Sequence, residues 1–339
     1  MSETQSSPNY SYSGKDILIT GGTGSLGTSL IKYFCSLPES IKPDRIVCLS
    51  RDWKDQAKLR AVVLSKSLRT FIGDIRDLDR LFMAFRGVDY VIHTAAIKSI
   101  VDCEYNPMEA VLTNVVGTWN VIRAAIDAKV ERVEFISSDK ATSPVATYGK
   151  SKALAESLIV ASGSYAPQTK FFAVRYGNVL GSNGSVLPIF LNQARLNSPF
   201  TITDPEMTRY WISLSQATDF VVKCLNGAAG GEIFIPKLRS STVADLARAI
   251  DPDRGIKYIG KRAGEKTHES LVSYEELGRL YDIGWSYYIE PEFPFWNRSW
   301  KPYGKLVPSG NTQLSSDAAD RFSNEELRAL ISEFEHDRV

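Results

Sequence analysis

The feature that most constrains the fold is a glycine-rich turn near the N-terminus. Gly21, Gly24 and Gly27 lie three residues apart, between a strand-like run at residues 15–20 and a helical pattern at 28–35. Glycines in this context allow a tight turn, a close approach of the backbone to a pyrophosphate and close packing of the helix on the strand. The turn therefore predicts a dinucleotide site, the alternative being a purely structural glycine turn. Other turn residues expected beside a cofactor are Thr23, Ser25 and Leu26.

Strand-like and helix-like segments then alternate along the first half of the chain. The predicted strands are residues 45–49, 70–75, 88–93, 133–136 and 170–175, and the predicted helices include 76–85, 109–129 and 148–161. This order is typical of an α/β fold with a doubly wound parallel sheet of the Rossmann type. We expect a flexible N-terminal tail at 1–14, an NADP-binding domain at 15–176 and a smaller, mainly substrate-binding C-terminal lobe at 177–339. Some segments of that lobe are expected to return to the Rossmann domain.

The end of the second predicted strand favours NADP over NAD. NAD enzymes usually carry a carboxylate at this place, where it binds the ribose diol. This chain has Ser50 and Arg51 instead, and a hydroxyl group beside a guanidinium fits a ribose 2′-phosphate. Lys54 follows in the same segment and is a further candidate for cofactor binding. The alternative is that Arg51 is a solvated arginine in a charged loop.

Two more strand ends are predicted to line the cofactor, because ligands of open α/β sheets bind at the carboxyl ends of the strands. Asp74 and Ile75 are placed to flank an adenine, and the small residues Ala95 and Ala96 leave room for the cofactor backbone. His93 has no second histidine or cysteine at ligand spacing. We therefore interpret His93 as structural and predict no metal site.

The densest group of acid–base side chains follows the strand predicted at 133–136. Residues 137–140 read Ser-Ser-Asp-Lys, and Tyr148 and Lys152 come shortly after them. Tyr148 and Lys152 are four residues apart, so on a helix they share one face, where the ammonium group can stabilise a phenolate. Tyr148 is then a candidate base near neutral pH. Because this spacing also arises by chance on exposed helices, its meaning depends on the rest of the chain.

Composition excludes several classes of protein. The chain has 40 Lys and Arg residues against 39 Asp and Glu, a net charge of +1, which gives no basic field for nucleic acid and no polybasic membrane patch. It has no run of about 18 apolar residues and no export signal, so we expect no membrane span. Its 4 cysteines show no CxxC spacing. We predict reduced thiols in a cytoplasmic protein.

Together these motifs resemble those of the extended short-chain dehydrogenase/reductases, and within them the inverting UDP-N-acetylglucosamine 4,6-dehydratase family. The resemblance covers most of the chain after the N-terminal tail, and the chain looks like the short soluble form, without the transmembrane region of longer relatives. The family commonly has Ser-Thr-Asp-Lys where this chain has residues 137–140, so a hydroxyl is kept at Ser138. The resembling segments are residues 20–27, 49–52, 104–109, 138–141, 148–152, 174–185, 203–212 and 264–269.

The resemblance implies conversion of UDP-N-acetylglucosamine to UDP-2-acetamido-2,6-dideoxy-β-L-arabino-hex-4-ulose, with NADP recycled internally. Tyr148 and Lys152 would serve the oxidation at C4, with Ser138 and Asn114 in the same set. Asn114, Tyr148 and Lys152 are also expected to bind the cofactor. Lys140 would remove the C5 proton and Asp139 would protonate the departing 6-hydroxyl. As a base, Lys140 should be partly neutral, so we expect burial and neighbouring cations to depress its pKa. The alternative for Lys140 is a structural ion pair with Asp139.

The resemblance also implies substrate contacts and an assembly. Helices 109–129 and 148–161 form the usual dimer interface of the superfamily, so we expect a homo-oligomer, at least a dimer and in this branch also larger rings such as a hexamer. Lys140 separates the inverting branch from retaining 4,6-dehydratases, which have glutamate there, and from 4-epimerases; both stay open as alternatives, as does a regulatory NADP-binding protein without catalysis. The expected contacts to the sugar diphosphate or uridine are Lys98, Asn178, Arg209, Arg262 and Glu265.

Overall fold

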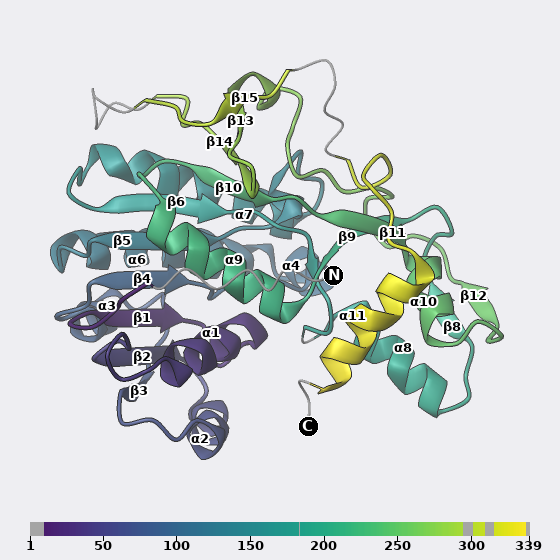
Figure 1. Cartoon of the computed structure of the whole chain (residues 1–339), viewed down its shortest axis with the longest axis horizontal. Helices are drawn as coiled ribbons and strands as arrows, with labels where there is room; N and C mark the ends of the chain where they lie inside the picture. The colour runs from purple at the N-terminus through teal and green to yellow at the C-terminus, as the bar shows by residue number, and fades with distance from the viewer. Residues whose placement is uncertain (1–9, 183, 294–300, 309–314, 337–339) are drawn as a thin grey trace.

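The fold is built on one large, mostly parallel β-sheet. The computed structural model describes residues 10–182, 184–293, 301–308 and 315–336. In these ranges the main sheet has ten strands in the order β15-β13-β14-β10-β6-β5-β4-β1-β2-β3 (Figure 1). The parallel strands are β3 (Leu68–Ile72), β2 (Arg45–Ser50), β1 (Asp16–Thr20), β4 (Tyr90–His93), β5 (Arg132–Ile136), β6 (Lys170–Val174) and β10 (Ile233–Pro236). The antiparallel extension is β14 (Ser286–Ile289), β13 (Leu280–Asp282) and β15 (Lys305–Leu306).

Both faces of this sheet are buried, because helices cover each of them. Helices α1 (Ser25–Ser36) and α9 (Leu214–Gly227) lie in front of the sheet in Figure 1, and α3 (Leu78–Ala84), α6 (Gly117–Asp127) and α7 (Thr147–Ala161) lie behind it. Side chains alternate along a strand, so Ile17 and Ile19 of β1 join one core while Leu18 joins the other. The predicted doubly wound α/β fold is confirmed. Helix α2 (Trp53–Val62) follows β2.

The glycine turn connects β1 to α1 with very little space. Gly21 has a φ of 66°, and a Cβ atom there would lie 2.8 Å from the backbone nitrogen of Ala95. A Cβ atom on Gly27 would lie 2.5 Å from the carbonyl oxygen of Gly21. Side chains at either position would separate β1, α1 and the end of β4, which is the close packing that the sequence predicted.

The single helix predicted at 109–129 is in fact three consecutive elements. They are α5 (Pro107–Ala110), the π-helical η1 (Val111–Val116) and α6, with α4 (Ile100–Tyr105) before them. Asn114 of η1 accepts a hydrogen bond from Ile97 N (2.8 Å) and donates to Ile97 O (2.9 Å) and to Ser151 Oγ of α7 (2.9 Å). The π-helical turn thus places Asn114 where it ties the loop after β4 to α7.

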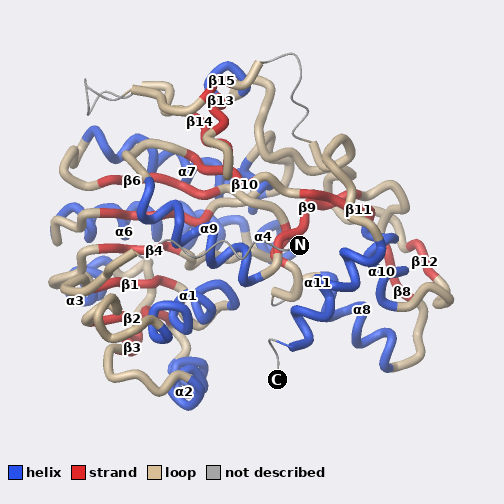
Figure 2. The backbone as a smooth tube through the Cα atoms, viewed as in Figure 1, coloured by secondary structure: helices blue, strands red, loops and turns tan. Residues whose placement is uncertain are grey.

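The C-terminal part of the chain forms a lobe beside the carboxyl ends of the parallel strands (Figure 2). This lobe contains a three-stranded sheet, a two-stranded sheet and helices packed on their own core. Its elements are β7 (Asn178–Val179), β9 (Thr208–Ile212), β11 (Arg239–Thr242), β8 (Phe200–Ile202), β12 (Ile256–Tyr258), α8 (Val186–Arg195), α10 (Val243–Ile250) and α11 (Asn324–His336). The same part of the chain also supplies α9 and β10 to the main sheet layer. Elsewhere in the chain, short helical turns lie at η2 (Asp139–Ala141), η3 (Ser162–Ser164) and η4 (Leu277–Arg279).

Two predictions made for individual residues are settled by burial. Residues 1–9 of the predicted flexible tail, 1–14, lie outside the described residues. For Tyr12 the prediction is wrong. That side chain is fully buried, its ring lies 5.1 Å edge-on from that of Phe34, and Asn226 Nδ2 donates to its hydroxyl. His93 is structural, as predicted, because its two ring nitrogens bond to the Thr20 and Thr118 hydroxyls at 2.7 and 3.0 Å.

Candidate active site

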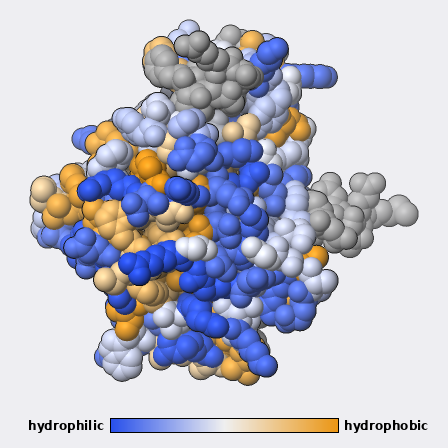
Figure 3. Space-filling model, turned by 90° about the vertical axis from the view of Figure 1, so that its left-hand side faces the viewer, coloured by the Kyte–Doolittle hydropathy of each residue, from blue (hydrophilic) through white to orange (hydrophobic). Residues whose placement is uncertain are grey.

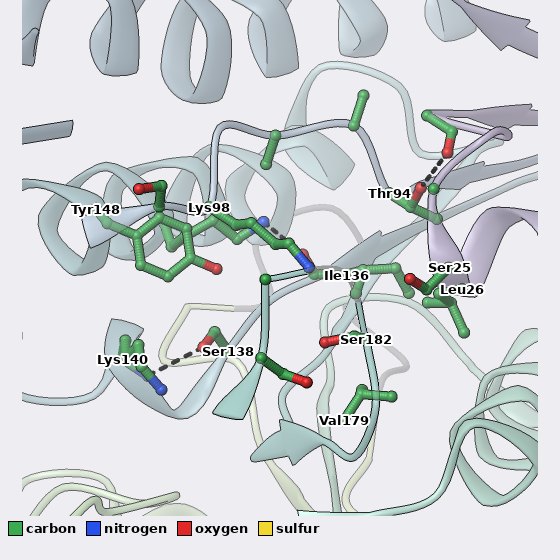
Figure 4. Close-up of a pocket in the computed structure, with 18 of the residues that line it drawn as sticks. Ser25, Leu26, Thr94, Lys98, Ile136, Ser138, Lys140, Tyr148, Val179 and Ser182 are labelled. Atoms are coloured by element: carbon green, nitrogen blue, oxygen red, sulfur yellow. Dashed lines mark hydrogen bonds between the residues drawn. The ribbon is translucent and has the colours of Figure 1, made fainter. Parts of the chain in front are cut away.

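A cleft of about 1060 Å³ opens at the carboxyl ends of β1, β2, β4 and β5, between the main sheet and the lobe. Figure 4 shows Tyr148, Ser138 and Lys140 toward one end of this cleft and Ser25, Leu26 and Thr94 toward the other, with Ile136 between them. The cleft therefore runs from the glycine turn to the acid–base stretch, which we define as residues 137–152. These are the two features that the sequence singled out.

The turn end of the cleft holds almost all the residues predicted to bind a cofactor. Of the others, Tyr148 and Lys152 line the opposite end. Lys54 and Asn114 do not line the cleft, although Asn114 holds a loop that does. The predicted residues that line it are Gly21, Thr23, Gly24, Ser25, Leu26, Gly27, Ser50, Arg51, Asp74, Ile75, Ala95 and Ala96. The N-terminus of α1 faces this end and favours negative charge there.

Arg51 is the most accessible cation near the end of β2 in the cleft. Its side chain is 62% exposed, and Nη1 lies 4.0 Å from Asp74 Oδ2. Asp52 is engaged as the N-cap of α2, where its Oδ1 accepts from Lys54 N at 2.7 Å. Ser50 Oγ accepts from Gln56 Nε2 at 3.0 Å. Arg51 thus has the freedom to reach an anionic group at this point of the cleft.

The acid–base stretch occupies the turn η2 after β5 and the first two turns of α7. Ser138 Oγ donates to Asp139 Oδ1 at 2.9 Å, and Lys140 Nζ donates to the same oxygen at 2.9 Å. Ser138, Lys140, Tyr148 and Lys152 line the cleft, whereas Asp139 is fully buried beneath its wall and does not. The side chain of Asp139 is therefore linked to the cleft by its hydrogen bonds with Ser138 and Lys140.

Gly149 lets α7 approach η2 closely enough to bring the two parts together. A Cβ atom on Gly149 would lie 2.2 Å from the carbonyl oxygen of Lys140 and 3.1 Å from Pro144 Cβ. Any side chain at this position would push the start of α7 away from the Asp139–Lys140 turn. Gly149 is thus the contact point that sets the spacing between Tyr148 and Lys140.

The pKa values of Lys152 and Tyr148 shift in ways that their spacing did not predict. Lys152 Nζ donates to the carbonyl oxygen of Ile136 and lies 3.9 Å from the centre of the Phe135 ring, and burial lowers its pKa to about 7. Burial raises the pKa of Tyr148, against smaller lowering effects of Lys140 and Ser138. Burial of the phenol thus outweighs the positive charge that acts on it, which comes from Lys140. The expected lowering by Lys152 together with an oxidised nicotinamide stays a prediction.

Lys140 also departs from expectation. Burial lowers the pKa of Lys140, but the carboxylates of Asp139 and Glu269 outweigh burial and the cation of Arg209, so that the net pKa is raised. Glu269 Oε1 lies 3.5 Å from Lys140 Nζ. The prediction of a depressed pKa is therefore wrong, since two carboxylates face this ammonium group where cations were expected to dominate.

The predicted substrate residues line the far part of the cleft, four of them from the lobe and Lys98 from the loop after β4. The four from the lobe are Asn178, Arg209, Arg262 and Glu265. Arg209 is nearly buried, and its guanidinium donates to the carbonyl oxygens of Thr267 (3.0 Å) and Lys266 (3.0 Å). Arg262 N donates to a carboxylate oxygen of Glu265 at 3.2 Å, which fixes the turn that carries both residues.

Several lining residues were not predicted as site residues, and four of them carry polar groups of particular interest. They are Tyr176, Ser182, Ser185 and Glu269. The first three follow β6 in the resembling segment 174–185, from which only Asn178 was predicted as a contact. Glu269 belongs to the resembling segment 264–269, yet nothing in its spacing points to Lys140. In the ranges that the structure describes, no cluster of three or more His, Cys, Asp or Glu side chains is placed to hold a metal ion.

The fold and the site together define an extended short-chain dehydrogenase/reductase. The sheet order and the glycine turn are those of this class. Ser138, Tyr148 and Lys152 line one end of the cleft, and Asn114 holds the loop after β4 beside it. Residues 17–291 match the family described as "Polysaccharide biosynthesis protein", and the chain belongs to that family.

Named relatives carry two different activities. The chain is 41% identical over 334 residues, 96% of its length and 99% of the relative's, to a UDP-N-acetylglucosamine 4,6-dehydratase (inverting) of Campylobacter jejuni subsp. jejuni serotype O:23/36 (strain 81-176). It is 42% identical over 331 residues, 94% of its length and 95% of the relative's, to a UDP-glucose 4-epimerase of Rickettsia akari (strain Hartford). Among solved structures it is similar to Pen from Bacillus thuringiensis, with 37% identity, a TM-score of 0.87, and coverage of 96% of this chain and 99% of that one.

Proposed function

We propose that the protein is an inverting UDP-N-acetylglucosamine 4,6-dehydratase. The observation that carries the proposal is the Asp139–Lys140 pair, joined at 2.9 Å and placed with Tyr148 at the reactive end of a dinucleotide cleft. The resemblance implies that retaining dehydratases have a glutamate at the position of Lys140 and that 4-epimerases lack the pair. The Campylobacter relative, which bears this name, supports the same proposal over nearly the whole chain.

The residues of the turn end fit a nicotinamide dinucleotide, because Gly21 and Gly27 leave no room for a side chain and α1 begins at the cleft. A nicotinamide held there would supply a reversible hydride acceptor for the sugar, with no net redox change over the reaction. We propose NADP as that cofactor, because Arg51 is exposed at the end of β2 while the carboxylate of Asp52 is engaged as a helix cap.

Arg51→Ala is expected to weaken NADP binding about 10-fold or more, since one charge-assisted contact to a phosphate is worth about 1.5–3 kcal/mol. NAD binding should change less than about threefold, because NAD lacks the 2′-phosphate. Fluorescence titration of both cofactors against the parent protein and Lys54→Ala, a nearby cation outside the cleft, measures the difference. Equal losses for NADP and NAD would remove Arg51 from 2′-phosphate recognition.

The acid–base residues divide the chemistry between two steps. Tyr148 accepts the proton of the 4-hydroxyl as C4 is oxidised, and Lys152 supports its phenolate. The resulting 4-keto group acidifies the C5 proton, because the carbanion is an enolate. Lys140 removes this proton, water is lost across C5 and C6, and C5 is later reprotonated from the opposite face.

Lys140 and Asp139 become base and acid by one internal proton transfer. The Lys140 ammonium donates to Asp139 Oδ1 at 2.9 Å, so that moving this proton leaves a neutral amine and a neutral carboxylic acid. The amine is the base for C5 and the acid supplies the proton for the departing 6-hydroxyl. Because Asp139 is buried, we assign the last transfer to Ser138, whose hydroxyl bonds to Asp139 and lines the cleft.

Lys98 and four residues of the lobe are proposed to hold the sugar nucleotide. Arg209 and Arg262 suit the diphosphate oxygens. Lys98, Asn178 and Glu265, which line the same part of the cleft, are assigned to the sugar or the uridine.

Proton NMR of the reaction with UDP-N-acetylglucosamine tests the function. We expect the signals of the 6-hydroxymethyl group to be replaced by a C6 methyl signal. Formation of a UDP-N-acetylgalactosamine or UDP-galactose product, from the matching substrates, would establish instead the 4-epimerase activity named for the Rickettsia relatives. NADP binding without turnover of any of these substrates would favour a regulatory protein.

We also propose that the protein is a homo-oligomer. Large hydrophobic side chains are exposed on consecutive elements behind the sheet, including Tyr105 (82%), Met108 (61%) and Leu154 (53%), and Figure 3 shows hydrophobic groups gathered on one half of the face that it presents. Such a surface is typical of an interface. No helix in the described part of the chain is both long and apolar enough to cross a membrane. The four cysteines are unpaired, which supports the proposed cytoplasmic location.

Sedimentation velocity is expected to give at least a dimer of the 37.7 kDa chain. Leu154→Glu should shift the protein to monomers, because it places a charge in the proposed interface. Leu196→Glu, at a leucine after α8 that is 68% exposed, is the control and should leave the mass unchanged. A monomeric parent protein, or an unchanged mass for Leu154→Glu, would contradict this interface.

A further inference from the structure

Glu269 is a buried carboxylate of the lobe that the proposed chemistry does not use. It is only 2% exposed, it lines the cleft, and its Oε2 makes no hydrogen bond. Burying a carboxylate with an unbonded oxygen lowers the free energy of unfolding. Stabilising the fold is therefore a poor explanation for a glutamate at this position. Its other oxygen, Oε1, lies 3.5 Å from Lys140 Nζ.

The backbone holds Glu269 in this place from two sides. Glu269 N donates to Ser316 Oγ at 2.9 Å, and Ser316 N donates to Glu269 O at 2.8 Å. Ser316 Oγ also shares a hydrogen bond of 2.6 Å with the hydroxyl of Thr208, next to Arg209 in β9. The lobe therefore fixes the carboxylate against the acid–base stretch of the Rossmann layer, from which Lys140 extends.

Lys140 consequently lies between two carboxylates that come from different parts of the fold. Asp139 of η2 approaches Nζ at 2.9 Å and Glu269 of the lobe at 3.5 Å. The other charged or titratable groups that face this centre are Arg209 from β9, Tyr148 from α7 and Lys266, whose Nζ lies 3.7 Å from Glu269 Oε2. Two negative charges around one ammonium favour its charged form.

We propose that Glu269 is a positioning residue for Lys140, which holds its amino group in the cleft beside Asp139 and sets the pH range over which that group is a neutral amine. Only the catalytic use of the amine rests on the proposed function. The electrostatic role follows from the geometry alone.

The role makes a definite prediction for Glu269→Gln, which keeps the shape of the side chain and removes its charge. An opposite charge within about 4–6 Å shifts a pKa by about 1–3 units, so the Lys140 pKa should fall by at least about one unit. Exposed Glu275→Gln, on the same part of the chain, is the matched control and should leave Lys140 unchanged.

Carbon-13 NMR of protein labelled at the lysine Cε atoms and loaded with NADP measures this pKa directly. The Lys140 signal is the one missing from Lys140→Arg. In the parent protein this signal should not titrate below about pH 10, which is the ordinary range of lysine. This part of the test needs no Glu269 variant. A midpoint below that value in the parent, or an unchanged midpoint in Glu269→Gln, would overturn the proposal whether or not the protein is a dehydratase.

The pH profile of dehydration gives the second arm. In Glu269→Gln the alkaline limb of kcat should move down by at least about one pH unit, because Lys140 and Asp139 then lose their shared proton to solvent at a lower pH, while KM changes less than about threefold. Glu269→Asp, which restores the charge, should return the limb toward that of the parent protein. A changed KM with an unshifted limb would make Glu269 a substrate contact and contradict its action on Lys140; absence of any dehydration would refute the proposed function and leave the NMR result standing.

Discussion

Replacing Lys140 by methionine is expected to lower the rate of dehydration by about 10²- to 10⁴-fold, the usual contribution of a positioned acid or base. Methionine keeps most of the length and volume of the side chain but has no proton to accept or donate. Asp139 would also lose the partner with which it exchanges a proton at 2.9 Å. The loss should therefore affect the C5 and C6 steps and spare oxidation at C4.

Single-turnover kinetics can separate these steps. With UDP-N-acetylglucosamine, Lys140→Met should still show formation of reduced nicotinamide by absorbance, but no C6 methyl product by NMR. Lys150→Met, at an exposed lysine of α7, is the control and should behave as the parent protein. Dehydration by Lys140→Met within about threefold of the parent rate would remove Lys140 from the role of base.

Gly149→Ala is the second change with a large expected effect. Its Cβ would lie 2.2 Å from the Lys140 carbonyl oxygen, so α7 and η2 must move apart. A displacement of about 1 Å between catalytic groups can cost about 100-fold in rate, and overpacking costs about 1–3 kcal/mol of stability. Both C4 oxidation and dehydration should fall, because the displacement separates Tyr148 from Lys140 without removing either.

Stopped-flow absorbance, product NMR and denaturant unfolding of Gly149→Ala measure these three effects. Gly227→Ala is the matched control, since a Cβ atom at that position meets no atom within 4 Å. Loss of dehydration with normal C4 oxidation in Gly149→Ala would contradict the view that this glycine sets the spacing of the whole acid–base stretch.

The local parts of the site could be predicted from the sequence because their residues are close together in the chain. The glycine turn, the Tyr148–Lys152 pair and the Asp139–Lys140 pair each lie within one turn or one helix, and the order of strands brings them to the same sheet edge. Asn114 was also found, although the π-helical turn that aims it at Ile97 was not.

The electrostatics of the site could not be predicted, because they depend on groups that meet only in the folded chain. Glu269 reaches Lys140 from the lobe and reverses the expected direction of its pKa shift. Burial has a similar effect on Tyr148, whose spacing to Lys152 says nothing of how much water the phenol retains. Tyr12, in a polar N-terminal segment, is buried because α1 and α9 leave space that its ring fills.

The central claim, dehydration with inversion at C5, is tested most directly by running the reaction with UDP-N-acetylglucosamine in heavy water and examining the product by NMR. The account predicts a 4-keto-6-deoxy product with deuterium at C5 and the L-arabino configuration. A product of the D-xylo configuration, or one that retains its 6-hydroxyl group, would contradict it.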